Sequence, residues 1–334
     1  MTEAEMLAAI VLVSNSDSDD DVGGGSIVVP DATEQQVNLV RLHDGIPIYL
    51  WRRSISFLTV REQTVSVRGV SRFFRECSNV YMQNFWSEPI LHLPQDARSL
   101  ASLMEMSQRL MEQEEYVEGT TVVVKLGSGV FEVVGSWYDT SGSMRQKTLS
   151  IPCDNLFIVG QGMGETIVDG SFAVENGRKI SFEGLTMTNS SGRGLVASGA
   201  GTKVVLKNVT VKECQSTGVY VQYGAKLVVT DCHFHENSSG VRVDGSPTTA
   251  RLTNSTTHHN KYHGVIALSG AVVDLMGEGM SVHDNGREGL YAIFSGATIN
   301  VYQPCVLNDM SHGNKGQNIK MVNGGIVQQK ESKK

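Results

Sequence analysis

The chain has 334 residues and a formal net charge of minus 7, but its acidity is concentrated at one end. Residues 1–40 hold eight carboxylates and no lysine or arginine, which leaves residues 41–334 at plus 1. A body this close to neutral argues against nucleic acid as a partner, and no apolar run has the ~20 residues needed to cross a bilayer as a helix.

Cysteine usage and the first residues indicate the compartment. The five cysteines are odd in number and contain no C-x-x-C pair, so neither a disulfide framework nor a zinc site is predicted. The apolar run Met6 to Val13 follows Glu3 and Glu5, where a secretory signal would carry positive charge. We therefore expect a soluble protein of the cytoplasm or nucleus, with no metal or other cofactor and no membrane partner.

The acidic tail, residues 1–40, is predicted to be disordered. Within it, a stretch rich in serine and aspartate follows a short β-prone run made of Ile10, Val11, Leu12 and Val13. The pattern resembles motifs that bind the small ubiquitin-like modifier by adding a strand to its sheet, with the flanking acids meeting basic residues. A tail that only keeps the protein soluble is the alternative.

Residues 41–90 carry short helical signals with fixed landmarks: Ile46-Pro47, Leu50, Phe57-Leu58, Val70-Ser-Arg-Phe-Phe74 and Trp86. Their order resembles the F-box, which runs from a Leu-Pro start through two short helices to a tryptophan. The resemblance implies docking on a Skp-type adaptor of a cullin ubiquitin ligase through Ile46, Pro47, Leu50, Ile55, Phe57, Leu58, Val70, Phe73 and Trp86. A helical cap for the rest of the chain is the alternative.

Residues 91–118 are predicted to be a capping helix and linker. A helix over 96–115, with Asp96 as its N-cap, would present one apolar stripe formed by Leu100, Leu103, Met104, Leu110 and Met111. The end of a solenoid exposes an apolar rung, so we expect this helix to cover it.

Residues 119–326 are a repeat, followed by a polar tail over 327–334. A glycine followed by core-compatible residues at positions +1 and +3 recurs at Gly194, Gly218, Gly240, Gly264 and Gly289, with spacings of 24, 22, 24 and 25 residues. Three short strands per turn of this length predict a mostly-β fold, a right-handed parallel β-helix solenoid. A leucine consensus and long 3.6-residue periodicity are absent, which argues against leucine-rich and helical repeats.

Each repeat has a predicted inside and outside. Positions +1 and +3 should point into the core, because strands of a stacked coil alternate between the two sides. We expect a turn with positive φ at each repeat glycine, and a ladder of stacked side chains formed by Asn189, Asn237, Asn260 and Asn285.

The first coils carry a family resemblance. The runs Val124-Lys-Leu-Gly-Ser-Gly-Val-Phe131, Leu156-Phe-Ile-Val-Gly-Gln-Gly162 and Thr166-Ile-Val-Asp-Gly170 resemble the pectin-lyase-like β-helix superfamily. The resemblance implies the fold and leaves the activity open, because the superfamily includes lyases, hydrolases, epimerases and binding modules.

Two functions follow from these resemblances. The first is a non-catalytic ligase subunit, in which the F-box-like segment docks on the adaptor and the β-helix selects a protein substrate. The second is a carbohydrate-active β-helix, a polysaccharide lyase, epimerase or glycan-binding module, in which residues 41–118 only cap the solenoid.

One outward face is predicted to bind the ligand in either case. Positions +2 and +4 of successive coils form a continuous patch, and its candidate binding residues are Tyr220, Gln222, Arg242, Asp244 and Tyr291. Only Asp244 offers a carboxylate there, whereas glycosidases need two, so we predict no catalytic residue. His235 and His259 precede their glycines by the same interval, but without accompanying carboxylates they predict no metal site.

Overall fold

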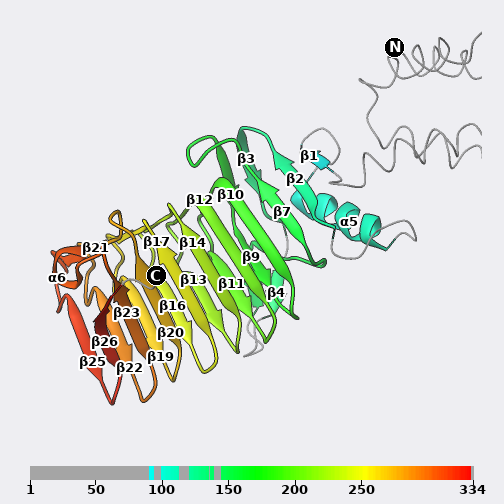
Figure 1. Ribbon diagram of the computed structural model, residues 1–334. Coiled ribbons are helices and arrows are strands. Elements are labelled where there is room, and N and C mark those ends of the chain that lie inside the picture. The colour runs from blue at the N-terminus through cyan, green and yellow to red at the C-terminus, as the bar shows by residue number, and fades with distance from the viewer. Residues whose placement is uncertain (1–89, 94–98, 113–119, 135, 139–143, 332–334) are drawn as a thin grey trace, which may run out of the picture. The chain divides into compact units, whose positions relative to one another are not determined.

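The computed structural model describes residues 90–93, 99–112, 120–134, 136–138 and 144–331 (Figure 1). All of them belong to the unit Val65–Lys334. The acidic tail with its run Ile10 to Val13, and the F-box-like landmarks from Ile46 to Trp86, lie outside the described residues and stay predictions.

The described residues confirm the predicted mostly-β solenoid. About eight coils of about 24 residues stack along one axis, and each strand pairs in parallel with the equivalent strand of the next coil. The coils succeed one another from green to red in Figure 1. Each coil has three faces, which we number in chain order within a coil.

The first face is a continuous row of ten paired strands. In spatial order they are β1 (Ile90–Leu93), β2 (Val122–Leu126), β7 (Leu156–Val159), β10 (Lys179–Thr188), β12 (Lys203–Lys212), β14 (Lys226–Thr230), β17 (Thr249–Thr253), β20 (Val272–Met276), β23 (Thr298–Tyr302) and β26 (Ile326–Lys330).

The second face joins the first because β10 and β12 are long enough to turn the corner between them. Its other strands are β3 (Gly129–Glu132), β8 (Thr166–Asp169), β15 (His233–His235), β18 (Thr256–His258), β21 (Ser281–His283) and β24 (Ser311–His312).

The third face is a separate sheet. Its strands are β6 (Thr148–Ser150), β9 (Ser171–Val174), β11 (Leu195–Ser198), β13 (Thr217–Gln222), β16 (Ser239–Asp244), β19 (Val265–Leu268), β22 (Leu290–Ile293) and β25 (Ile319–Val322). A small antiparallel pair, β4 (Ser136–Tyr138) and β5 (Met144–Gln146), stands outside the coils.

The core lies inside the three faces, and the predicted inward positions are confirmed. The residues at +1 and +3 of all five repeats are completely buried: Leu195, Ala197, Val219, Val221, Val241, Val243, Val265, Ala267, Leu290 and Ala292. Because side chains alternate along a strand, the residues at +2 and +4 point to the outer side of the third face.

The reason for the repeat glycines differs from the prediction. Positive φ does not occur at Gly194, Gly218, Gly240, Gly264 or Gly289; it occurs at a second series that follows the third-face strands, such as Gly224 and Gly270. A Cβ on Gly218 would instead lie 2.8 Å from the carbonyl oxygen of Gly240 in the next coil. Close approach of neighbouring coils, rather than a left-handed turn, requires these glycines.

The predicted asparagine ladder exists with one change of membership. The backbone N–H of Asn237 donates to Oδ1 of Asn260, that of Asn260 to Asn285, and that of Asn285 to Asn314. Asn189 was wrongly assigned to it: its φ is +57°, its side chain is exposed, and it donates to Asp169. The early end of the ladder is the backbone N–H of Cys214, which donates to Oδ1 of Asn237.

The helix predicted over 96–115 is found with different boundaries. Helix α5 (Leu100–Met111) buries Leu100, Leu103, Met104 and Leu110 in the common core. Its N-cap is Ser99 in a capping box with Ser102, not Asp96. Strand pairing begins before residue 119, because β1 pairs with β2.

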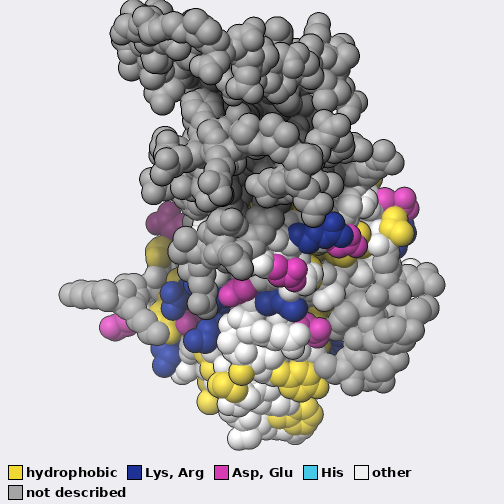
Figure 2. Space-filling model, turned by 90° about the vertical axis from the view of Figure 1, so that its right-hand side faces the viewer, with side chains coloured by type: hydrophobic (Ala, Val, Ile, Leu, Met, Phe, Trp, Pro, Cys, Tyr) yellow, Lys and Arg dark blue, Asp and Glu magenta, His cyan; other side chains and the backbone are white. Residues whose placement is uncertain are grey.

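At the other end, β26 runs into the predicted polar tail, and a short helix α6 (Leu307–Met310) precedes β24. The four cysteines in the described part, Cys153, Cys214, Cys232 and Cys305, are buried and free. None of the described helices is long and apolar enough to cross a membrane. On the face shown in Figure 2, the described basic and acidic side chains are interspersed.

Candidate functional site

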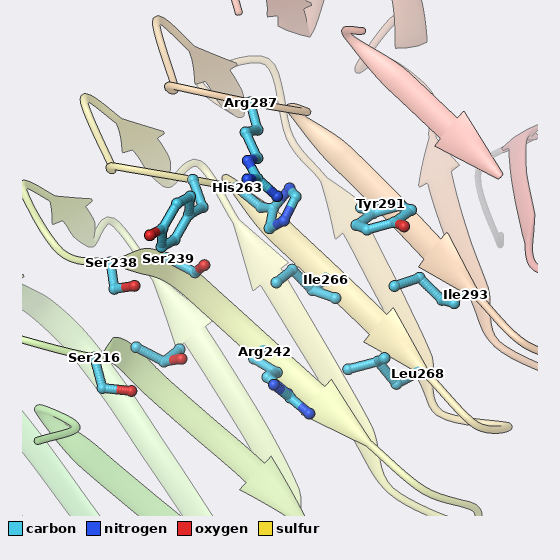
Figure 3. Close-up of a pocket in the computed structure, with 12 residues that line it drawn as sticks. Ser216, Ser238, Ser239, Arg242, His263, Ile266, Leu268, Arg287, Tyr291 and Ile293 are labelled. Atoms are coloured by element: carbon cyan, nitrogen blue, oxygen red, sulfur yellow. The ribbon is translucent and has the colours of Figure 1, made fainter. Parts of the chain in front are cut away.

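A groove lies on the outer side of the third face, across β13, β16, β19 and β22. Its volume is about 450 Å³. It is lined by Ser216, Thr217, Ser238, Ser239, Arg242, Tyr262, His263, Ile266, Leu268, Arg287, Tyr291 and Ile293. Figure 3 shows these side chains as sticks over the adjacent strands.

The groove has an apolar floor set by strand register. Ile266 is the pairing partner of Arg242 on one side and Tyr291 on the other. Leu268 is paired in the same way with Ile293. Ile266 and Leu268 are buried, so the floor is apolar and the polar groups of the groove stand at its edges.

Tyrosines in and beside the groove each lie under basic side chains. The Arg193 guanidinium lies 4.1 Å from the ring centroid of Tyr220, and that of Arg287 lies 4.9 Å from the ring of Tyr262. The Lys320 ammonium lies 5.4 Å from the ring of Tyr291. Such distances are within the range of cation–π attraction. The pairs repeat along the axis, so aromatic rings and positive charges are distributed over several coils.

At the early end, Arg242 and Tyr220 share one acid. Arg242 donates to Asp244 Oδ2 at 3.0 Å, and the Tyr220 hydroxyl donates to the same oxygen at 3.2 Å. Burial raises the pKa of Tyr220, an effect that the neighbouring arginines oppose. The phenol therefore stays protonated at neutral pH and acts as a donor.

At the late end, Glu288 lies between two basic groups. Its Oε1 accepts from Lys320 Nζ at 2.7 Å, and its Oε2 lies 2.9 Å from His263 Nδ1. Burial alone would raise the pKa of Glu288, but the hydrogen bond from Lys320 brings it below its usual value. Burial lowers the pKa of His263 in spite of Glu288. At neutral pH Glu288 is therefore ionised and His263 is neutral.

A buried nitrogen atom at the groove, Nε of Arg242, has no hydrogen-bond partner. Nδ1 of His263 is also buried, but Oε2 of Glu288 lies 2.9 Å from it. Buried polar groups in native proteins are rarely left unpaired. Nε of Arg242 therefore indicates a place where a ligand would supply an acceptor.

The sequence-predicted binding residues are only partly brought together. Arg242 and Tyr291 line the groove, and Asp244 and Tyr220 lie beside it through their contacts with Arg242. Gln222 does not take part: it is buried, and its amide donates to Ser198 at 3.4 Å.

Sequence reasoning missed the second wall of the groove. This wall comes from residues that directly precede the repeat glycines: Ser216-Thr217, Ser238-Ser239, Tyr262-His263 and Arg287. The residue types at positions −2 and −1 of the repeat differ from coil to coil. A comparison of these two positions along the repeat would have found the wall. Asp244 is the single carboxylate at positions +2 and +4, but Glu288, at position −1, also lies beside the groove through its contact with His263.

The arrangement favours binding of an anion. Five basic side chains contact the tyrosines here, namely Arg193, Arg242, Lys261, Arg287 and Lys320, against the two carboxylates of Asp244 and Glu288. Across the described ranges, no group of three or more histidine, cysteine or acidic side chains is placed to hold a metal ion.

Comparisons with known proteins bear on the fold. The family model described as "Right handed beta helix region" matches residues 166–325, just under half of the chain. Among solved structures, the chain is similar to the A-module of the Azotobacter vinelandii mannuronan C-5 epimerase AlgE6, at 16% identity and a TM-score of 0.43, covering 69% of this chain and 70% of that one.

It is also similar to the pectate lyase Pel9A, at 13% identity and a TM-score of 0.40, covering 72% of this chain and 74% of that one. A search of curated proteins finds no match. The coils described above therefore include a right-handed β-helix region over residues 166–325.

Proposed function

We propose that the groove binds an extended acidic polysaccharide, a chain of uronate sugars, lying along the solenoid axis. The observation that carries the proposal is the succession of tyrosines flanked by basic side chains over consecutive coils. Aromatic rings offer flat surfaces to sugar rings, and arginine matches carboxylates with paired N–H donors.

The unpaired nitrogen of Arg242 supports an anionic ligand. Arg242 Nε is buried without an acceptor, and a carboxylate or hydroxyl oxygen would supply one. Coils repeat every ~4.8 Å, so one sugar chain would meet several coils at once.

The site supports binding rather than hydrolysis. A glycosidase needs a carboxylic acid with a raised pKa opposite a second carboxylate. The pKa of Glu288 is lowered and its oxygens are held by Lys320 and His263. Asp244 already accepts hydrogen bonds from Arg242 and Tyr220. Both carboxylates neutralise neighbouring cations instead of reaching toward a substrate.

Calorimetry of the full chain with an oligouronate tests this function. We expect binding that weakens as salt is added, and a loss of about tenfold or more in affinity for Arg287→Ala. Arg251→Ala is the matched control, because Arg251 lies on the first face and pairs with Asp274 at 3.9 Å. Equal affinity for a neutral oligosaccharide, or equal losses in the two variants, would contradict the proposal.

A second function is favoured by the sequence of residues 46–86. Its F-box-like landmarks support docking on a Skp-type adaptor, with the β-helix selecting a protein for ubiquitination. Retention of the adaptor by the full chain, and its loss when Leu50 and Leu58 are replaced by Asp, would support this role. An adaptor that is never retained would remove it and leave the groove proposal standing.

A further inference from the structure

Four histidines form a stacked row at the end of the second face. His235, His258, His283 and His312 end β15, β18, β21 and β24 and pair in register from coil to coil. Their ring centroids are separated by 4.9, 5.1 and 5.2 Å, and adjacent rings are within 8° of parallel. We call this set the histidine row.

Two of the four row members are followed by an acid. His235 lies 3.1 Å from Glu236, and His283 lies 2.8 Å from Asp284. One coil earlier, at the same position, Lys212 pairs with Glu213 at 3.2 Å. Acids also act on histidines of adjacent coils, because Glu213 interacts with His235 and Asp284 with His259 and His312.

His258 and His312 are the row members without a following acid. Gly313 follows His312. The residue after His258 is His259, whose Nδ1 lies 2.7 Å from Nδ1 of His258. His259 also packs edge-on against His283. A proton on His258 would therefore face imidazoles above, below and beside it, with no carboxylate in its own coil.

The other charged groups nearby do not replace that acid. His233, on the same strand as His235, adds a further imidazole within the reach of His258. Helix α6, which packs against β21 and β24, carries Asp309. Strand β16, which packs against β15 and β18, carries Arg242 and Asp244, and these two pair with each other at the groove.

We propose that the histidine row is an acid-sensitive seam: protonation of its stacked imidazoles, uncompensated at His258, loosens the C-terminal coils of the solenoid. The rings stack on one another at this corner. Positive charges on adjacent members would lie about one coil spacing apart.

The pKa of His258 is shifted in the direction that the proposal requires. Burial, followed by the neighbouring imidazoles, lowers the pKa of His258 to about 4, against ~6.5 for an unperturbed histidine. Between pH ~6.5 and ~4, His258 is therefore protonated in the unfolded chain but neutral in the folded chain. The free energy of unfolding falls as the pH drops through that window.

The experiment restores the missing acid. In the full chain, His259→Asp places a carboxylate beside His258 at a position with φ +52°, which aspartate tolerates. We expect NMR titration to show His258 protonating at higher pH in this variant, and urea unfolding to show a smaller loss of stability between pH 7 and pH 5 than in the native chain. Glu236→Gln should act in the opposite direction, and His92→Asn, on β1, should change neither.

The native chain alone gives an independent readout. After correction for intrinsic rates, amide exchange in β18, β21 and β24 should accelerate at pH 5 relative to that in β7 and β10. Uniform exchange along the solenoid at both pH values would overturn the proposal. So would a His259→Asp protein whose His258 titration and acid sensitivity match those of the native chain.

Discussion

The groove and the histidine row are built by the same device, one position of the repeat stacked over successive coils, but they differ in whether the residue changes. The row keeps histidine in four consecutive coils. The positions before the repeat glycines change from Ser-Thr and Ser-Ser to Tyr-His and Arg-Glu along the groove. Where the same residue type recurs at one position of every coil, it forms part of the scaffold. Where the residue type changes from coil to coil at a surface position, it can form a binding site.

The scaffold should be the most sensitive to substitution. In Gly264→Ala, the new Cβ would lie 2.4 Å from Val282 Cγ1 and 2.8 Å from the carbonyl oxygen of Gly289. Because the backbone of the next coil has little room to move, we expect a loss of about 3 kcal/mol in unfolding free energy, measured by urea denaturation. Gly164→Ala, where nothing lies within 4 Å of the new atom, should leave stability unchanged, and equal losses would break the account of the repeat glycines.

The interior ladder should come next. Asn260→Ala removes the acceptor for the N–H of Asn237 and the donor to the carbonyl of Phe234. Leaving such buried groups unpaired should cost about 2 kcal/mol. Asn308→Ala, at an exposed position of α6, is the control. If the two variants unfold at the same urea concentration, the ladder does not hold the coils together.

The late end of the groove should respond to pH. Lys320→Met removes the hydrogen bond that keeps the pKa of Glu288 low. A lowered carboxyl pKa stabilises the fold above the unfolded value of ~4.3 and is lost as the pH falls through the folded value. The variant should therefore be less stable than the native chain at pH 7 and equal to it in strong acid.

A surface pair gives the matched control for that experiment. Lys207 pairs with Glu183 at 2.8 Å on the first face, where both side chains are more exposed than Glu288. Lys207→Met should lose less stability at pH 7, since solvent screens exposed pairs. If the two variants lose the same unfolding free energy at pH 7, burial of Glu288 does not strengthen its interaction with Lys320.

The smallest effect is expected at the edge of the groove. Arg193 contacts the ring of Tyr220 at 4.1 Å but does not line the groove itself. Arg193→Ala should weaken oligouronate binding by about two- to fivefold, less than Arg287→Ala in the same titration. A larger loss at Arg193 would move the centre of the site toward the early coils.

The repetitive parts of the molecule could be predicted from the sequence, because they depend on a period that can be counted. Leu195, Val219 and Val241 were placed inside correctly, since alternation from each glycine decides the side of the sheet. The reason for the glycines could not be read in this way, because the approach of Gly240 to Gly218 exists only between coils.

The aperiodic parts could be predicted only in fragments. Arg242 and Tyr291 were found because they lie within the strand pattern. Tyr262 and His263 precede their strand, and Glu288 meets Lys320 from the following coil, so their grouping depends on how coils stack. Gln222 shows the reverse error: its outward position suggested a binding residue, but the coil before it supplies Ser198 as a partner.

The proposal that the groove binds an acidic glycan is tested most directly by titrating the full chain with uronate oligomers of increasing length, beside neutral oligomers of the same lengths. The account predicts that affinity rises with each uronate until the chain spans the groove from Arg242 to Tyr291, then levels off, and that Arg287→Ala removes most of the gain. An affinity that does not depend on uronate length, or that neutral oligomers match, would contradict it.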